Sequence, residues 1–311
     1  MRIAVFGAGA VGGYFGGRLA QAGHSVVFIA RGAHLEAVRR DGLVVRSTSG
    51  DFAVRPAEAT DTPADAGQVD VVLLAVKAWQ VREAGRSMLP MLGEGSCVVP
   101  LQNGVEACDE LAAEVGPGRV LGGLCRLISV LEAPGHIRHA GVTPRIEFGE
   151  PDGRPSARVE ALRAAFDAAV GVSAAVPADV AAAIWEKFLF IAPFSGVGAV
   201  TRAPAGVMRA VPETRAMLQS AMREVAALAR ARGVTLREEA VARTLSFVDS
   251  LPADATASMQ RDLMEGRPSE LEYQNGAVVR LARQAALPVP VHAFLFASLL
   301  PAEMKARGAG R

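Results

Sequence analysis

Three glycines near the N-terminus form the motif whose chemistry is easiest to read from the sequence. The pattern Gly-x-Gly-x-x-Gly is filled by Gly7, Ala8, Gly9, Ala10, Val11 and Gly12. It directly follows an apolar strand and opens a helix, and in that context the spacing is typical of a loop that binds a dinucleotide. The first glycine permits a tight turn, the second lets the backbone approach the pyrophosphate, and the third lets helix and strand pack closely. Because free N–H groups at the positive end of a helix attract phosphates, we predict that these six residues bind a dinucleotide cofactor.

The residue at the end of the second predicted strand indicates which dinucleotide is bound. An acidic residue at that place, about 20 residues after the glycines, would bind the ribose 2′-hydroxyl of NAD. The segment from Phe28 to Gly32 has no carboxylate and instead contains Arg31. A guanidinium can pair bidentately with a 2′-phosphate, so we predict NADP(H) as the cofactor. The alternative is that Arg31 is an ordinary solvated arginine.

Two further polar side chains follow predicted strands. Lys77 ends the apolar run Val71–Val76, and Asn103 comes after Leu101 and Gln102. Ligands of open α/β sheets bind at the carboxyl ends of the strands, which makes both residues candidates for the cofactor site. The structural alternatives are a surface lysine and a turn formed by the Asn-Gly pair.

A lysine interrupts the apolar face of the helix predicted at Ala178–Ile191. At 100° per residue, one stripe of this helix is formed by Val180, Ile184, Phe188 and Ile191. Lys187 falls inside that stripe, between Ile184 and Ile191. A partly desolvated ammonium readily takes part in acid–base chemistry, whereas the alternative is a lysine that extends its charge to solvent.

The last candidates lie between residues 258 and 276. Ser258 opens a polar segment, and Glu270 stands at the start of a helix predicted at Glu270–Ala285. An acid at a helix start also complements the helix dipole, so Glu270 has a structural alternative. The same helix would hold Asn275 in its middle, on the apolar face. That placement is costly in helix propensity and predicts a packing or binding role for Asn275.

The elements that would position these residues follow two patterns. The first two thirds of the chain alternate β-rich runs with helical patterns, which predicts a parallel sheet covered by helices. Strands are predicted at residues 2–6, 25–30, 69–76, 97–101 and 142–148, with a helix at 10–22 and a hairpin at 43–45 and 52–54. Helical patterns then dominate, at 178–191, 213–232, 237–250 and 270–285. We predict an α/β Rossmann domain with a doubly wound, mostly parallel sheet at 1–177, and an all-α C-terminal domain at 178–311.

Composition narrows the function classes. The 311 residues include 33 basic and 32 acidic side chains, a balance that argues against a nucleic-acid surface. The three cysteines show no paired spacing and the histidines are scattered, so we expect buried thiols in a reducing compartment and no metal site. The longest later apolar run, Phe188 to Val200, contains a proline and two glycines and is shorter than the roughly 18 residues that span a bilayer. We expect a soluble cytoplasmic protein with no membrane partner.

In order and spacing, these motifs resemble the ketopantoate reductase (2-dehydropantoate 2-reductase) family over essentially the whole chain. The matching pieces are residues 7–12, Arg31, residues 77–80, 102–104 and 185–187, and Ser258 through Gly276. The resemblance implies NADPH-dependent reduction of a small 2-oxo acid to a 2-hydroxy acid, with ketopantoate as the expected substrate and pantothenate biosynthesis as the pathway. It implies that Lys187 is the general acid and that Glu270 is an acid at the junction of cofactor and substrate. It also implies that Asn103 and Lys77 line the nicotinamide end of the site and that Ser258 holds the substrate.

The sequence departs from the family pattern where substrate asparagines are expected. Four and eight residues after the lysine, this chain has Ile191 and Ser195, and a third position is taken by Ala205. Ser195 remains a substrate-binding candidate, but lost amides weaken recognition of the hydroxyl groups of pantoate. A second hypothesis is therefore a paralogous NADPH-dependent reductase of a more apolar 2-oxo acid. A third is a non-catalytic NADP(H)-binding regulatory protein. For the oligomeric state, we consider a homodimer possible from the sequence.

Overall fold

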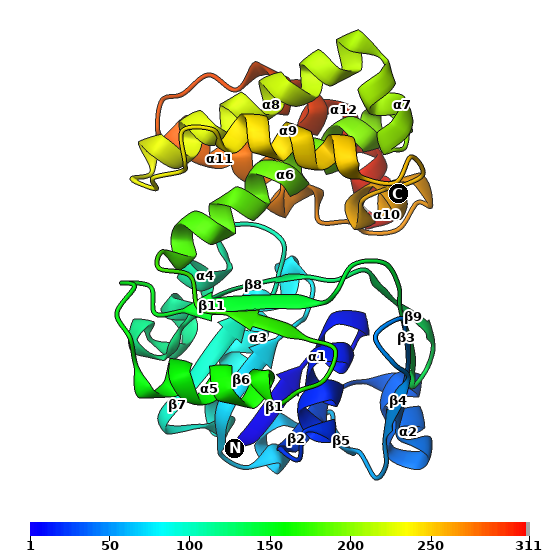
Figure 1. Ribbon diagram of the computed structural model, residues 1–311, viewed down its shortest axis with the longest axis vertical. Helices are drawn as coiled ribbons and strands as arrows, with labels where there is room; N and C mark the ends of the chain where they lie inside the picture. Colours follow the sequence, from blue (N-terminus) through cyan, green and yellow to red (C-terminus); the bar gives the residue numbers. More distant parts are fainter. Residues whose placement is uncertain (309–311) are drawn as a thin grey trace. The chain divides into compact units, whose positions relative to one another are not determined.

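The computed structural model describes residues 1–308, and the chain divides into two compact units (Figure 1). The α/β unit comprises Met1–Gln102 and Ala107–Val180. The helical unit comprises Asn103–Glu106 and the residues from Ala181 onward. The short segment Asn103–Glu106 therefore packs with the helical unit, although it lies in the first half of the sequence.

The α/β unit is built on a five-stranded sheet in which each neighbouring pair of strands is parallel. In spatial order the strands are β5 (Glu58–Thr60), β2 (Ser25–Ile29), β1 (Arg2–Phe6), β6 (Val69–Leu74) and β7 (Leu92–Pro100). The predicted parallel sheet is thus confirmed. The order reverses beside β1, and ligands of such sheets bind at the carboxyl ends of the strands where the order reverses. The glycine motif follows β1 at that place.

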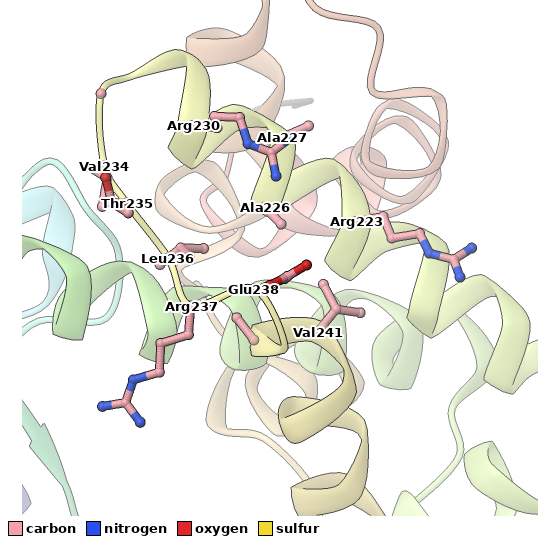
Figure 2. Close-up of a pocket in the computed structure, with 12 residues that line it drawn as sticks. Arg223, Ala226, Ala227, Arg230, Val234, Thr235, Leu236, Arg237, Glu238 and Val241 are labelled. Carbon is pink, nitrogen blue, oxygen red and sulfur yellow. The ribbon is translucent and has the colours of Figure 1, made fainter.

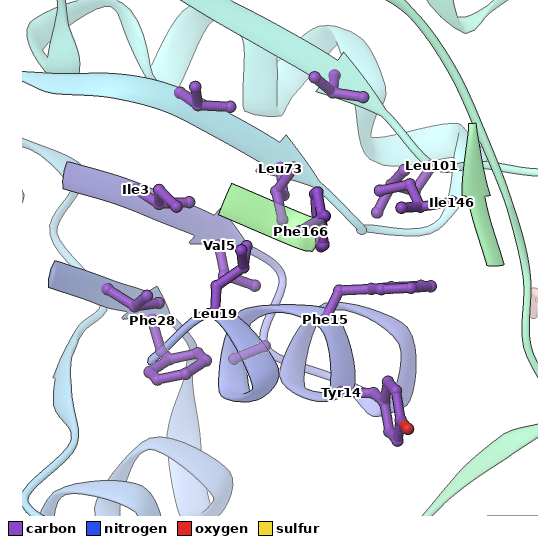
Figure 3. Packing of buried hydrophobic residues seen from close by; sticks show 14 of the residues in the cluster. Ile3, Val5, Tyr14, Phe15, Leu19, Phe28, Leu73, Leu101, Ile146 and Phe166 are labelled. Carbon is purple, nitrogen blue, oxygen red and sulfur yellow. The ribbon is translucent and has the colours of Figure 1, made fainter. Parts of the chain in front are cut away.

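Both faces of this sheet are covered, which explains why its central strands β2, β1 and β6 are mostly apolar. Ile3 and Val5 of β1 point to one face, where they pack with residues of α1 (Ala10–Gln21) and α5 (Ala157–Asp167), as Figure 3 shows. The intervening residues of β1 belong to the opposite cluster, which includes side chains of α3 (Val81–Ser87) and α4 (Ala107–Val115). The alternation of side chains along a strand therefore anchors β1 in two separate cores.

Two smaller sheets complete the α/β unit. The first contains β4 (Phe52–Val54), β3 (Leu43–Ser47), β10 (His136–His139) and β9 (Ser129–Ala133), in that order. The second contains β12 (Ser173–Ala175), β11 (Arg145–Gly149) and β8 (Gly122–Arg126). The predicted hairpin is confirmed, because β3 and β4 pair in antiparallel fashion. The strand predicted at 142–148 is β11, which begins later and pairs antiparallel with β8. Helix α2 (Gly32–Asp41) follows β2.

The helical unit contains no strand among its described residues, as predicted. Its helices are α6 (Val180–Thr201), α7 (Ala205–Ala210), α8 (Pro212–Ala231), α9 (Ala240–Ser250), α10 (Ser258–Met264), α11 (Asn275–Gln284) and α12 (Pro290–Ala306). The amphipathic α8 and α9 bury one face each in a core that they share with α6, α11 and α12. The sequence patterns did not predict α12.

Helix α6 does not end at Ile191 as predicted but continues to Thr201, through Pro193. A proline lacks the N–H that would bond to the carbonyl four residues earlier, which is why its position indicated an end. The helix persists because its apolar side chains, among them Phe188 and Leu189, are buried in the core of the unit. By length and composition alone α6 could cross a membrane. Its burial is typical of the central helix of a folded domain.

The prediction that Asn275 lies in the middle of a helix is wrong. Residues Leu271–Tyr273 form a 3₁₀ turn, and α11 begins only at Asn275. The backbone of Gln274, at φ −110° and ψ −88°, separates the two elements. The propensity cost expected at a central position therefore does not arise. Asn275 is fully buried, and its Nδ2 donates to the carbonyl of Ala192 on α6 over 3.1 Å.

Candidate active site

The three glycines of the motif each occupy a different geometry. Gly7 has φ +97°, in the region that favours glycine, and a Cβ there would lie 2.9 Å from the carbonyl carbon of Ala75. A Cβ on Gly12 would lie 2.2 Å from the oxygen of Gly7. Helix α1 can therefore pack against the loop only without a side chain at that position. By contrast, no atom lies within 4 Å of a Cβ built on Gly9, so the space beside its backbone is open.

The start of α1 can receive an anion. Gly9 is the N-cap residue, and no side chain caps the helix there. The N–H groups of Gly7 and Ala8 both donate to the carbonyl of Ile29 over 3.1 Å, which ties the loop to the end of β2. The first N–H groups of a helix have no partner within it, and the helix dipole adds positive charge at this end. The loop and helix thus fit the pyrophosphate of a dinucleotide.

Arg31 lies between the end of β2 and the start of α2, where it is the N-cap residue. Its guanidinium is 3.7 Å from the carboxylate of Glu83, and both side chains are about two-thirds exposed, at 67% and 66%. Such an exposed ion pair is weak and does not prevent a phosphate from binding the arginine. The structure therefore leaves Arg31 accessible at the end of the strand next to β1.

Lys77 follows β6, and its side chain is exposed to solvent. Its Nζ lies 5.9 Å from the centre of the Trp79 ring. The turn that leads to Lys77 is held by Gln102, whose Nε2 donates to the carbonyls of Leu74 (2.9 Å) and Val76 (3.0 Å). Gln102 is buried, and it joins the ends of β6 and β7. Sequence reasoning gave Gln102 no role of its own, because nothing in its spacing indicates these contacts.

The helical unit brings together two of the predicted site residues. The Nδ2 of Asn103 donates to Oε2 of Glu270 over 3.3 Å, although 167 positions separate them. Glu270 is only 5% exposed, so its carboxylate is held in a largely buried environment. A carboxylate in such a place needs hydrogen-bond donors, and Asn103 supplies one. The amide oxygen of Asn103 can still accept a hydrogen bond from another group.

The backbone that carries Glu270 is fixed by the end of α12. Glu303 is buried and accepts hydrogen bonds from the backbone N–H of Ser269 at 3.0 Å, from its hydroxyl at 2.6 Å, and from Nε of Arg307 at 2.6 Å. The hydroxyl oxygen of Ser269 in turn accepts a hydrogen bond of 3.2 Å from the backbone N–H of Leu271. The residues on both sides of Glu270 are therefore held. Sequence reasoning missed Glu303, which lies on the helix that the patterns did not predict.

Lys187 lies near the middle of α6, and its side chain is half-buried. Ile184 and Ile191, one turn before and after it, are also half-buried, whereas the adjacent Phe188 is fully buried. Its neighbour Glu186 faces another direction and pairs with Arg237 over 3.4 Å. The lysine thus has apolar flanks on its own helix while remaining in reach of solvent, an arrangement suited to a partly desolvated ammonium.

The two serine candidates differ in accessibility. Ser258 is the first residue of α10 and is half-buried. Ser195 lies two turns after Lys187 and is fully buried, and its Oγ has no partner among the residues that the structure describes. The Oδ1 of Asn275 and the amide of Gln274 are likewise buried without a partner within residues 1–308. Ser195, Gln274 and Asn275 thus carry four buried side-chain atoms that could hydrogen-bond to a further group.

A surface cavity of about 450 Å³ lies elsewhere in the helical unit, between α8 and α9. Three arginines line it, but Figure 2 shows that Arg223, Arg230 and Arg237 point in different directions. Arg237 instead forms the ion pair with Glu186. The arginines do not converge on one anion, and no predicted site residue lines this cavity.

The cysteines have no catalytic geometry. Cys97, Cys108 and Cys125 form no disulfide within the described part of the chain, and two of them are buried, as expected of structural thiols. Burial raises the pKa of the Cys97 thiol to about 11. A thiol with so high a pKa is not a nucleophile at neutral pH.

A parallel sheet whose first strand leads into a dinucleotide loop, together with an all-α unit, defines a class of two-domain dinucleotide-binding proteins. Comparison with known proteins identifies the family. Residues 3–153 match the family described as ketopantoate reductase PanE/ApbA, and residues 179–303 match its C-terminal part. The chain belongs to the ketopantoate reductase family.

Individual relatives are similar over nearly their whole length. An uncharacterized oxidoreductase of Bacillus subtilis, YkpB, is 31% identical over 299 residues, which covers 96% of this chain and 98% of the relative. A 2-dehydropantoate 2-reductase of Mesorhizobium japonicum is 33% identical over 93% of this chain and 94% of its own. The crystal structure of 2-dehydropantoate 2-reductase from Geobacter metallireducens has a TM-score of 0.90 at 32% identity, covering 97% of this chain and 100% of that one. The protein is therefore an oxidoreductase of a family that reduces 2-oxo acids with NAD(P)H.

Proposed function

We propose that this protein reduces ketopantoate to pantoate with NADPH, as a cytoplasmic enzyme and with Lys187 as the general acid. The observation that carries the proposal is the hydrogen bond between Asn103 and Glu270. It joins two residues for which the family resemblance implies a role at the reaction centre, and both belong to the same unit as Lys187 and Ser258.

The preference for NADPH rests on Arg31. The glycine loop fits the pyrophosphate of either nicotinamide dinucleotide, so the discrimination must come from the group near the ribose. Arg31 offers a planar cation at that place, and no acid lies in the segment from Phe28 to Gly32 that would favour NAD. When NADPH is bound, its nicotinamide supplies the hydride.

The proton is assigned to Lys187. As the carbonyl carbon of the 2-oxo acid is reduced, negative charge develops on the ketone oxygen. An ammonium directed at that oxygen stabilises the charge and then supplies the proton, which completes the alcohol. Asn103, whose Nδ2 is engaged by Glu270, keeps an oxygen acceptor for a polar ligand group. Ser258 is the first residue of α10, and its hydroxyl can hydrogen-bond to the substrate.

A second candidate substrate is a 2-oxo acid with a more apolar side chain. Ile191 stands half-buried one turn after Lys187, where the family carries an amide. Ala205, at another such position, is fully buried. These residues offer apolar contact and no hydrogen bond to a hydroxyl. Ser195 is the one polar side chain left at the three positions.

A panel of 2-oxo acids assayed by NADPH consumption tests the proposal. We expect turnover of ketopantoate, with a KM that is raised by the missing asparagines, and slower turnover with NADH. Higher kcat/KM for unhydroxylated 2-oxo acids than for ketopantoate would favour the second candidate. No turnover of any 2-oxo acid with either cofactor would contradict both.

A further inference from the structure

His34 contacts the glycine loop, although no motif marks it. It is the third residue of α2, three positions after Arg31, and its side chain is half-buried. Its Nε2 lies 2.8 Å from the carbonyl oxygen of Ala8, between the first two glycines. Its Nδ1 accepts a hydrogen bond of 3.0 Å from the backbone N–H of Gly135, in the turn between β9 and β10.

Only one form of the ring satisfies both contacts. A backbone N–H can donate only to a ring nitrogen that carries no proton, so Nδ1 of His34 must be unprotonated. In a neutral imidazole the single proton is then on Nε2, which donates it to Ala8. The contact with Gly135 therefore selects the tautomer that can hold the loop.

The carbonyl of Ala8 sets the direction of the next N–H group. A trans peptide unit is planar, so the C=O of Ala8 and the N–H of Gly9 point in opposite directions. Gly9 is the N-cap of α1, and its N–H has no partner within the helix. Holding the carbonyl toward His34 thus directs the Gly9 N–H to the opposite side, away from α2. The loop is not crowded there, because a Cβ built on Gly9 would meet no atom within 4 Å. The N–H of Ala8 is separately fixed by Ile29.

We propose that His34 is a positioning residue for the cofactor loop: by holding the Ala8 carbonyl, it orients the Gly9 N–H toward the cofactor's pyrophosphate. This inference rests on the proposed function, because it requires that a nicotinamide dinucleotide bind at the loop. His34 itself touches neither the substrate nor the reacting atoms. Its loss should therefore weaken cofactor binding and leave the rate at saturating cofactor nearly unchanged.

Three substitutions separate this role from a general structural one. His34→Gln keeps an amide nitrogen at the position of Nε2, where it can still donate to Ala8. His34→Asn keeps an acceptor at the position of Nδ1 for Gly135 but cannot reach Ala8. His34→Ala removes both contacts. As a control, His136→Gln alters an exposed histidine next to Gly135, whose Nδ1 lies 3.1 Å from the carbonyl oxygen of Pro134.

The measurement is the Kd for NADPH by fluorescence titration, with kcat at saturating NADPH and the melting temperature of each variant. We expect His34→Ala and His34→Asn to raise the Kd about two- to tenfold, the usual effect of one neutral hydrogen bond. His34→Gln and His136→Gln should stay within about twofold of wild type, and kcat should change little in all four proteins.

Three results would overturn the inference. One is a Kd that stays at the wild-type value in every variant, and another is normal binding by His34→Asn with weak binding by His34→Gln. A loss of affinity that simply follows the loss of melting temperature, His34→Gln included, would also reduce His34 to a structural residue. If the wild-type protein binds neither NADPH nor NADH, the proposed function fails instead. Wild-type binding with an unresponsive series contradicts only the role of His34.

Discussion

Ile191→Asn introduces the amide that the family pattern has one turn after its lysine. The substitution tests whether the missing amide lowers the affinity of this chain for ketopantoate. Ile191 is on the same face of α6 as Lys187 and is half-buried. If the substrate oxygen meets Lys187, an amide at position 191 lies within one helical turn of it. One added hydrogen bond to a neutral hydroxyl is worth about 0.5–1.5 kcal/mol, so the KM for ketopantoate should fall roughly two- to tenfold.

The same substitution carries a cost in stability. Ile191 packs against the core of the helical unit. Full burial of an isoleucine is worth about 1.5–3 kcal/mol, so a half-buried side chain contributes about 1 kcal/mol. For a chain of this size that loss lowers the melting temperature by roughly 2–4 °C. The gain in substrate affinity should therefore appear in a slightly less stable protein.

The assay compares ketopantoate with its deoxy analogue, in which a methyl group replaces the hydroxymethyl group. Ile191→Asn should improve KM for ketopantoate and leave the analogue unimproved, because only the former has the hydroxyl. Val200→Asn is the control, since it places an amide at another half-buried position of α6 that lies more than three turns from Lys187. Equal improvement for both substrates, or an improvement in the control, would refute the reasoning. So would a wild-type KM for ketopantoate in the low micromolar range.

Three other changes test separate parts of the structure. Arg31→Ala should raise the KM for NADPH about tenfold and leave the KM for NADH unchanged. The control Arg40→Ala, an exposed position on the helix that follows Arg31, should alter neither KM. An unchanged ratio of the two KM values in Arg31→Ala would mean that Arg31 does not meet the phosphate. Glu303→Gln should weaken the hydrogen bonds to Ser269 that hold the segment around Glu270. We therefore expect kcat to fall up to about tenfold while the Kd for NADPH stays within twofold. Normal turnover would show that the segment around Glu270 does not need these hydrogen bonds. Burial lowers the pKa of His292 despite its hydrogen bond to Glu224. The folded state therefore disfavours the protonated ring. The stability that the neutral ring contributes is complete above the ordinary pKa of 6.5 and is lost as the pH falls below it. The melting temperature should then fall more between pH 7.5 and 5.5 in wild type than in His292→Asn, and equal slopes would contradict this assignment.

Local patterns were sufficient to predict much of the α/β unit. The roles of Gly7 and Gly12 depend on a strand, a turn and a helix that are consecutive in sequence, so spacing alone could indicate them. The parallel sheet followed from continuous apolar runs, because β1 buries alternate residues in two cores. Such features need no information about distant parts of the chain.

Contacts between distant segments could not be predicted in this way. No periodicity indicates that Asn103 would meet Glu270, because that contact depends on how two remote segments pack. The prediction that this helix ends at Ile191, when α6 continues to Thr201, was wrong for a related reason. Gly196 and Gly198 look like helix breakers, yet a Cβ on the first would lie 2.5 Å from Nδ2 of Asn275, and one on the second 2.6 Å from Oε1 of Gln260. Their absent side chains leave room for close packing, which local propensity does not show.

In the proposed reaction, this chain reduces a 2-oxo acid with NADPH, and Lys187 supplies the proton. The most direct test is turnover by Lys187→Ala, measured as NADPH consumption with saturating ketopantoate, together with the Kd for NADPH. We predict a loss of about 10²–10⁴-fold in kcat with an unchanged Kd, because the glycine loop and Arg31 are not altered. Near-normal turnover in the variant would contradict the account, and it would leave Lys187 as a lysine that only extends its charge to solvent.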